Sequence, residues 1–282
     1  MKSFTKEDII QYYDLTKVHY QRAWDLSESR SMHYGFKNKS SDSFRDSLQN
    51  MNWAMADYVG INKHDRVLDA GCGIGGSSFF LANEYACKVT GISLSKDQIE
   101  EARVHLEELK LEELEFMVAD FTDLPFEDSS FDVIWALESL VHCENKQNFF
   151  KEANRVLKPG GKIILGEYLR NNRSYSKKEE VLLTKWLNAW AIKEIDYISD
   201  YEKLVLNLGY NAIKHKNITE NIRYSSWRMF YGSWFLFVLS KLYKIYNPNV
   251  TQFADQHYKG LYYQYLCLRQ NLWSYWLICI EK

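Results

Sequence analysis

The residues best suited to chemistry form a glycine-rich turn that begins at an acidic residue. The sequence is Asp69-Ala70-Gly71-Cys72-Gly73-Ile74-Gly75-Gly76, and it follows a short apolar run. Glycines in such a turn let the backbone bend tightly and let a ligand lie against it. Gly71, Gly73 and Gly76 also have the spacing of a dinucleotide-binding turn, so spacing alone does not choose the ligand. Because a carboxylate at Asp69 would repel a pyrophosphate and attract an ammonium group, we expect a cationic ligand.

A second candidate pair, Glu138 and His142, follows another apolar run at 131–136. The carboxyl ends of strands in open α/β sheets face the ligand crevice. Residues four apart share a face on a helical turn, so the two side chains are predicted to act together. We predict a general base or a substrate-orienting role for them. The alternative is that Glu138 only positions the loop and that His142 packs in the core.

Short apolar runs alternate with amphipathic stretches between Arg66 and Tyr168, which is typical of βαβ units and a parallel sheet. Strands are expected at 66–70, 88–92, 114–119, 131–136, 162–167, 210–218 and 272–280. Helices are expected at 77–84, 96–109, 146–157 and 200–208, and Lys158-Pro159-Gly160-Gly161 is expected to end the third of these.

Aromatic residues make up 16% of the chain and are concentrated toward its C-terminal end. We predict a helical insertion at 222–270, with breaks at Gly232, Pro248 and Gly260. Trp227, Tyr231 and Trp234 are expected to form one wall of an apolar pocket. Two alternatives are that the insertion simply packs on the sheet, or that it contacts a membrane surface.

Composition narrows the class of protein. The net charge of −2 and the isoelectric point near 6.4 offer no basic surface for nucleic acid. No apolar stretch has the length of a signal peptide or of a membrane span. The five cysteines form no Cys-x-x-Cys pair, which predicts reduced thiols in a cytoplasmic protein. No metal site is predicted.

Four segments resemble, in order and spacing, the motifs of class I S-adenosylmethionine-dependent methyltransferases. These segments are Val67–Gly75, Val89–Gln98, Val118–Phe121 and Arg155–Gly161. Ser93 stands where most members carry an acid for the cofactor's ribose. This departure is shared by a subgroup similar to tocopherol and sterol methyltransferases and cyclopropane fatty-acid synthases.

The resemblance implies S-adenosylmethionine as the cofactor and assigns residues to it. The glycine turn would wrap the methionine part, Asp69 would organise that turn, and Asp120 would accept a hydrogen bond from the adenine amino group. The implied cofactor-binding residues are Asp69, Gly71, Gly73, Gly75, Ser93, Leu94, Gln98, Asp120, Phe121 and Leu137.

The segment before the first strand resembles the stretch that lies over the cofactor in tocopherol and sterol methyltransferases. Residues expected to close the site are Tyr20, Trp24, His33 and Tyr34. The predicted fold is therefore an α/β, Rossmann-like seven-stranded sheet with helices on both faces and an aromatic-rich helical cap. Residues 1–60 would form the lid, and residues 61–282 the methyltransferase domain.

The implied function is methyl transfer to a small, largely apolar acceptor, with an isoprenoid or aromatic carbon as the first choice. Transfer to the nitrogen or oxygen of a natural product is the alternative within the same enzyme class. A cofactor-binding protein without turnover is the rival from another class. No nucleic acid partner is expected.

Overall fold

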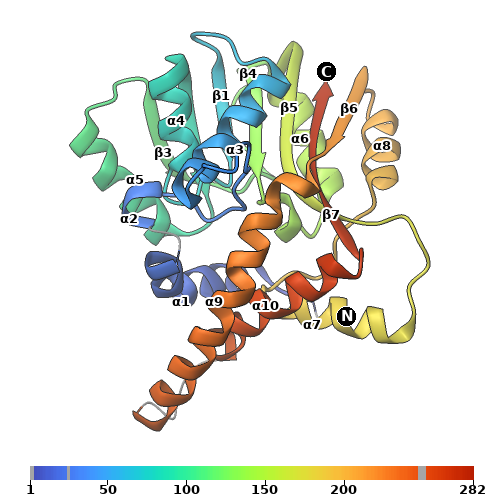
Figure 1. Cartoon of the computed structure of the whole chain (residues 1–282). Helices are drawn as coiled ribbons and strands as arrows, with labels where there is room; N and C mark the ends of the chain where they lie inside the picture. Colours follow the sequence, from blue (N-terminus) through green and yellow to red (C-terminus); the bar gives the residue numbers. More distant parts are fainter. Residues whose placement is uncertain (1–2, 24–25, 247–251) are drawn as a thin grey trace.

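The fold is built on a mixed sheet in a computed structural model that describes residues 3–23, 26–246 and 252–282. Seven strands lie in the order β3-β2-β1-β4-β5-β7-β6 (Figure 1), which confirms the predicted α/β sheet. The strands are β1 (Arg66–Ala70), β2 (Lys88–Ser93), β3 (Leu114–Val118), β4 (Phe131–Leu137), β5 (Leu157–Arg170), β6 (Ala212–Asn217) and β7 (Trp273–Glu281).

The first five strands run parallel, and β7 enters antiparallel between β5 and β6. The carboxyl ends of β1 to β4 therefore meet at one edge of the sheet. The chain order changes direction between β1 and β4, because β2 and β3 lie on one side of β1 and β4 on the other. Open α/β sheets bind ligands at such a switch point, so the order alone predicts where the site lies.

Helices cover both faces of this sheet (Figure 1). The side chains of Met55, Phe79 and Ile99 bring α3, α4 and α5 into one buried cluster, while Phe150 and Tyr201 bring α6 and α8 into a second. The helices are α1 (Lys6–Ala23), α2 (Leu26–Ser29), α3 (Phe44–Val59), α4 (Gly76–Tyr85), α5 (Lys96–Leu109), α6 (Lys146–Val156), α7 (Lys177–Ala189), α8 (Ile198–Asn207), α9 (Thr219–Tyr246) and α10 (Gln252–Arg269).

Capping residues explain why the start of some helices could be predicted from the sequence. Helix α5 spans the predicted residues because the side chain of Ser95 accepts a hydrogen bond from the amide of Gln98. Helix α7 was not anticipated, although the sequence carries a signal for it. Ser176 and Glu179 form a capping box at its start, and this Ser-x-x-Glu spacing is visible in the sequence.

Strand β5 begins earlier than predicted. The expectation that Lys158-Pro159-Gly160-Gly161 separates a helix from a strand at Lys162 is wrong, because β5 already pairs with β4 at Leu157. The register shifts along this pair, from Phe131 opposite Leu157 to Val133 opposite Lys162. The proline and glycines thus form an irregularity inside the strand pair rather than a turn before it.

The prediction that Gly232 and Gly260 break the inserted helices is also wrong. Both lie inside helices, Gly232 in α9 and Gly260 in α10, while Pro248 falls outside the described residues. Gly260 has a packing role: a Cβ atom added there would lie 2.2 Å from Nε1 of the buried Trp190. Glycine therefore lets α10 approach the Trp190 ring closely.

We expect Gly260→Ala and Gly232→Ala to have opposite effects on stability. Forcing a methyl group against Trp190 should lower the free energy of unfolding by about 1–3 kcal/mol. Gly232 has open space around its α carbon, so alanine there should stabilise the protein by up to about 1 kcal/mol through helix propensity. Urea denaturation of both variants beside the unmodified protein measures the difference. Equal stability of the two variants would contradict the packing role of Gly260.

Candidate active site

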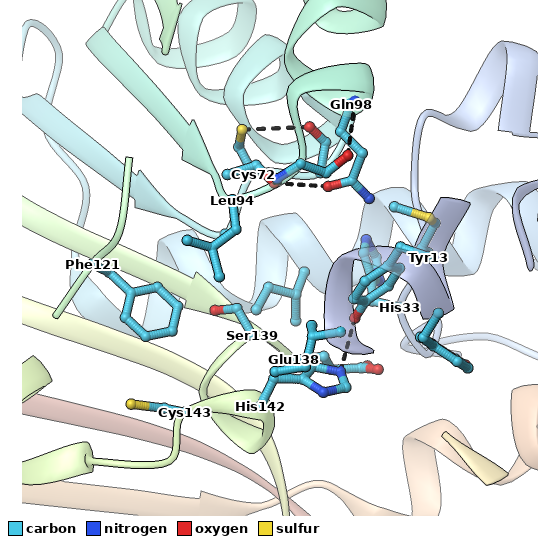
Figure 2. A pocket seen from close by; sticks show the side chains of 18 of the residues that line it. Tyr13, His33, Cys72, Leu94, Gln98, Phe121, Glu138, Ser139, His142 and Cys143 are labelled. Carbon is cyan, nitrogen blue, oxygen red and sulfur yellow. Dashed lines mark hydrogen bonds between the residues drawn. The ribbon is translucent and has the colours of Figure 1, made fainter. Parts of the chain in front are cut away.

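A cavity of about 380 Å³ lies at the carboxyl ends of the parallel strands. Its floor comes from the ends of β1, β2 and β4 and from the loop after β3. Residues of α1 and the segment 30–34 close it from the opposite side, and Met229 and Leu261 line it from α9 and α10. Figure 2 shows this arrangement, with Leu94 and Phe121 across the cavity from Tyr13.

The glycine turn leaves β1 at the floor of the cavity. The amides of Gly71 and Cys72 both donate to the carbonyl of Ile92, which ties the turn to β2. Gly71 has a φ angle of 101°, and a Cβ atom there would lie 2.3 Å from Cβ of Ser139. The Ser139 hydroxyl donates to the carbonyl of Ala70 at 2.6 Å. Glycine at 71 thus lets the loop after β4 pack against the turn.

Asp69 lies at the start of this turn and lines the cavity. Its side chain is only 2% exposed, and its Oδ2 atom accepts a hydrogen bond from the Ser78 hydroxyl at 2.6 Å. Burial raises the pKa of Asp69 to about 7, even though the bond from Ser78 favours the charged form. A buried carboxyl that is hydrogen-bonded by Ser78 and faces the cavity is well placed to receive a positively charged ligand.

Gly73 and Gly75 differ in position. Gly73 lines the cavity, and a Cβ atom added there would meet only the terminal methyl of Met32, at 3.0 Å. Gly75 does not line it: a Cβ atom there would lie 2.7 Å from the Phe116 ring and 2.8 Å from the Phe79 ring. The expectation of a cofactor contact at Gly75 is therefore corrected, because its α carbon faces the packing of α4 against β3.

The predicted polar group after β2 is assembled as a small hydrogen-bond network. The Ser93 hydroxyl donates to Oε1 of Gln98 at 2.8 Å and accepts from the Ser95 amide at 3.2 Å. Ser93, Leu94, Ser95 and Gln98 all line the cavity. At the end of β2, where most members of the resembled family carry an acid, this chain therefore has the hydroxyl of Ser93 and the side-chain amide of Gln98.

Asp120 and Phe121 lie in the loop after β3 and also line the cavity. The carboxylate of Asp120 accepts hydrogen bonds from the amide and hydroxyl of Thr122, at 2.8 and 2.7 Å, and pairs with Lys6. Burial pushes the pKa of Asp120 upward, but the bonds from Lys6 and Thr122 outweigh it and leave the pKa below its ordinary value. Asp120 is therefore ionised and acts as a hydrogen-bond acceptor.

Glu138 follows β4 directly, after Leu137, which also lines the cavity. Its φ angle of 54° lies in the left-handed region, and its amide donates to the carbonyl of Gly166 at 2.8 Å. Its Oε1 atom accepts two hydrogen bonds of 2.7 Å, from the Tyr34 amide and from the Tyr275 hydroxyl. Burial nevertheless raises the pKa of Glu138 to about 8, against both of these bonds.

His142 ends a short 3₁₀ turn, η1 (Leu140–His142). Its Nε2 atom lies 3.0 Å from the Tyr13 hydroxyl (Figure 2). Its Nδ1 atom lies 3.4 Å from the carbonyl of Ala191. Burial lowers the pKa of His142 to about 4, so the ring is neutral near pH 7. We assign the proton to Nδ1, which donates to Ala191, and this leaves Nε2 to accept from Tyr13.

The prediction that Glu138 and His142 share one face of a helical turn is wrong. The left-handed backbone at Glu138 precedes the 3₁₀ turn, so the two residues are not on one helix. Both nevertheless line the cavity.

The lid residues have different placements. His33 and Tyr34 are buried and line the cavity. The Tyr34 hydroxyl donates to Gln264 at 3.0 Å while its amide binds Glu138, so Tyr34 links α10 to the site. Tyr20 lies in α1, but its side chain is outside the described part of the structure, and Trp24 falls outside the described residues.

The structure corrects the expectation that Trp227, Tyr231 and Trp234 form a wall of the pocket. None of them lines the cavity, and their side chains are 47–59% exposed on α9. The reason is the orientation of α9 about its own axis. Met229, on the other face of the helix, points inward and is buried, so the three aromatic side chains face outward.

Several residues that line or support the cavity were not predicted from the sequence. Tyr13 lies in α1, and Tyr275 comes from the last strand, 137 residues after Glu138. No local pattern marks Tyr275, because only the pairing of β7 with β5 brings it to the site. For Trp190 the sequence offers one indirect sign, a glycine at position 260 inside a helix, which leaves room for the Trp190 ring.

Neither a metal-binding cluster nor a membrane-spanning helix occurs in the described ranges 3–23, 26–246 and 252–282. Within them, no three His, Cys, Asp or Glu side chains gather in a way that would bind a metal ion. The helices in the same ranges do not combine the length and hydropathy that a membrane span requires.

The methyltransferase domain family matches residues 68–165, which contain the glycine turn, Asp120 and Glu138. A chloroplastic tocopherol O-methyltransferase of Arabidopsis thaliana is 30% identical over 240 residues, covering 77% of this chain and 66% of that protein. The chain spans about 60–66% of the length of the first curated relatives it matches.

Solved structures show the same fold. The cyclopropane synthase MmaA2 of Mycobacterium tuberculosis superposes with a TM-score of 0.84 at 14% identity, covering 99% of both chains. A geranyl diphosphate C-methyltransferase of Streptomyces coelicolor, solved with Mg²⁺, geranyl diphosphate and S-adenosyl-L-homocysteine, gives 0.73 at 18% identity and covers 99% of both chains. The ordered motifs, the sheet order and these likenesses agree: residues 68–165 belong to the methyltransferase domain family, which confirms the resemblance to the class I S-adenosylmethionine-dependent methyltransferases.

Proposed function

We propose that this protein transfers a methyl group from S-adenosylmethionine to a small, largely apolar acceptor, with an isoprenoid or aromatic carbon as the first choice. The observation that carries this proposal is the placement of Glu138. Its carboxyl lies in the same cavity as the glycine turn and Asp69, directly after β4, the strand that pairs with β1.

The residues along the strand ends suit an elongated, cationic cofactor. Gly71 and Gly73 present backbone without side chains, Asp69 offers a buried carboxyl, and Asp120 offers an ionised acceptor farther along the sheet edge. Ser93, Leu94 and Gln98 would hold the part between them. When bound, the cofactor supplies a methyl group activated by its sulfonium. The protein's task is then to position the acceptor, exclude water and move one proton.

The opposite wall of the cavity is suited to an apolar acceptor. Met229 and Leu261 line it together with the rings of Tyr13 and Trp190. Two of the similar proteins are named for isoprenoid-type acceptors, tocopherol and geranyl diphosphate. Aromatic faces would also stabilise a positive charge that develops on the acceptor.

Glu138 is proposed as the base. A methylated carbon must lose a proton to restore its alkene or ring, and a hydroxyl must lose one before it attacks. With a pKa of about 8, Glu138 has a proton affinity close to that needed for transfer near neutral pH. His142, neutral and held by Tyr13 and Ala191, is proposed as a residue that orients the acceptor.

Transfer to oxygen is the second candidate, and the name of the Arabidopsis relative favours it. For this chain we further propose the lid and domain limits given above, residues 1–60 and 61–282. The five cysteines are buried and free, which supports a reducing compartment such as the cytoplasm.

The test is transfer of a labelled methyl group from S-adenosylmethionine to a panel of acceptors: prenylated phenols, isoprenyl diphosphates and natural-product amines. We expect label in an organic-extractable product from a prenyl or aromatic acceptor, and product analysis identifies the methylated atom. Transfer of the label only to amines would contradict the proposal of a largely apolar acceptor. Binding of S-adenosylhomocysteine without transfer to any acceptor would instead support the non-catalytic binding protein.

A further inference from the structure

Helix α9 carries a stripe of exposed apolar side chains that the active site does not use. Trp227, Tyr231, Trp234 and Val238 recur at spacings of four, three and four residues, so they share one face of the helix. Their exposed fractions are 47, 55, 59 and 55%, and the adjacent Phe235 is 68% exposed. Soluble proteins rarely leave so large a contiguous apolar surface in water unless it binds something.

The inner face of the same helix already provides its packing. Ser226 donates to Gln264 of α10 at 2.7 Å, and the ring of Phe230 lies 4.5 Å from that of Tyr265 between centroids. Met229 is buried at the cavity. Of the outer stripe, Trp234 also reaches α10, with its ring 6.2 Å from that of Tyr262 between centroids, but it stays 59% exposed. The outer stripe therefore contributes little to holding α9 against α10.

Charge on this helix pair differs from charge on the rest of the chain. Residues 219–269 contain two acidic residues, Glu220 and Asp255, against six basic ones, whereas the whole chain has a net charge of −2. The basic residues of this segment are Arg223, Arg228, Lys241, Lys244, Lys259 and Arg269. The aromatic surface thus lies within a locally positive segment, which complements an anionic surface.

Helices α9 and α10 lie next to the cavity as well as projecting from the sheet. Figure 1 shows α9 and α10 projecting side by side away from the sheet. Met229 and Leu261 of this pair line the cavity, close in sequence to Trp227 and Tyr231. Trp and Tyr are the side chains most enriched at the boundary between water and lipid, and helices that combine them with Lys and Arg lie flat in that boundary.

We propose that the exposed face of α9 docks on an anionic lipid bilayer, so that an apolar acceptor can pass from the bilayer into the adjoining cavity. The docking follows from the aromatic stripe and the local positive charge. The acceptor route additionally rests on the proposed methyltransferase function.

The test is co-sedimentation with vesicles of phosphatidylcholine, with and without phosphatidylglycerol. The unmodified protein should sediment with the phosphatidylglycerol vesicles and be released by high salt, because screening weakens the attraction. The triple variant Trp227→Ala, Trp234→Ala, Phe235→Ala should lose at least about tenfold in partition coefficient. The matched control is Val181→Ala with Leu206→Ala, exposed apolar residues on α7 and α8, and it should partition normally.

Calorimetry with S-adenosylhomocysteine on each variant shows whether the fold and the cofactor site are intact. If the unmodified protein ignores both kinds of vesicle, or the triple variant partitions as before, the docking proposal is wrong. A dimer in sedimentation equilibrium that the triple substitution dissociates, without vesicle binding, would also overturn it in favour of self-association. Vesicle binding without methyl transfer to any acceptor would contradict the proposed function and leave the docking supported.

Discussion

Replacing Asp69 with asparagine is expected to weaken S-adenosylmethionine binding by at least about 100-fold. The substitution keeps the size of the side chain and removes its charge, so a cationic ligand would lose a buried, charge-assisted partner. Isothermal titration calorimetry with S-adenosylmethionine and S-adenosylhomocysteine measures the effect. Ser78→Ala, which removes the hydroxyl donor 2.6 Å from Asp69, should have a smaller effect in the same direction.

The pH dependence gives an independent test of the same residue. Because burial raises the pKa of Asp69 to about 7, the free carboxyl takes up a proton as pH falls below that value. Binding a cation then requires that proton to leave, so affinity should fall below pH 7 in the unmodified protein and not in Asp69→Asn. If asparagine leaves the affinity unchanged at every pH, the assignment of the cofactor to this turn is wrong.

Glu138→Gln should reduce the turnover rate by about 10²- to 10⁴-fold, the usual contribution of a general base. Glutamine preserves an oxygen that can accept from the Tyr34 amide and the Tyr275 hydroxyl, so the affinity for S-adenosylhomocysteine should change by less than about threefold. Steady-state kinetics and calorimetry on the same preparation separate the two effects. Tyr275→Phe, which removes one donor to Glu138, is the matched variant and should lower the rate less.

The rate should also depend on the ionisation of Glu138. Because the pKa of Glu138 is about 8, the fraction of Glu138 that is ionised increases as pH rises from 6 to 9. The turnover rate of the unmodified protein should rise with this fraction. Tyr275→Phe removes a hydrogen bond to the carboxylate and should shift this profile to higher pH. A near-normal rate for Glu138→Gln would show that Glu138 only positions its loop.

The sheet and the cofactor edge could be predicted because their signals are local. The apolar run before Asp69 and the cap at Ser95 fix a strand and a helix from neighbouring residues alone. The glycine turn shows where a ligand can approach backbone. Even here the pattern was partly misleading, since Gly75 matches the motif but faces Phe79 and Phe116.

The acceptor side could not be predicted because its contacts join distant parts of the chain. Glu138 receives hydrogen bonds from Tyr34 and Tyr275, which lie 104 and 137 residues away. The aromatic segment was recognised as helical, but composition cannot give the rotation of a helix. Met229 therefore faces the cavity where Trp227 was expected, and the stripe faces outward.

Binding of S-adenosylhomocysteine in competition with nicotinamide and flavin nucleotides tests the central claim most directly. We predict one tight site per chain for S-adenosylhomocysteine, lost in Asp69→Asn, with a crystal structure of the complex showing its amino-acid part against Gly71 and Gly73. Preferential binding of a nicotinamide or flavin nucleotide at that turn, or no binding of S-adenosylhomocysteine by the folded protein, would contradict it.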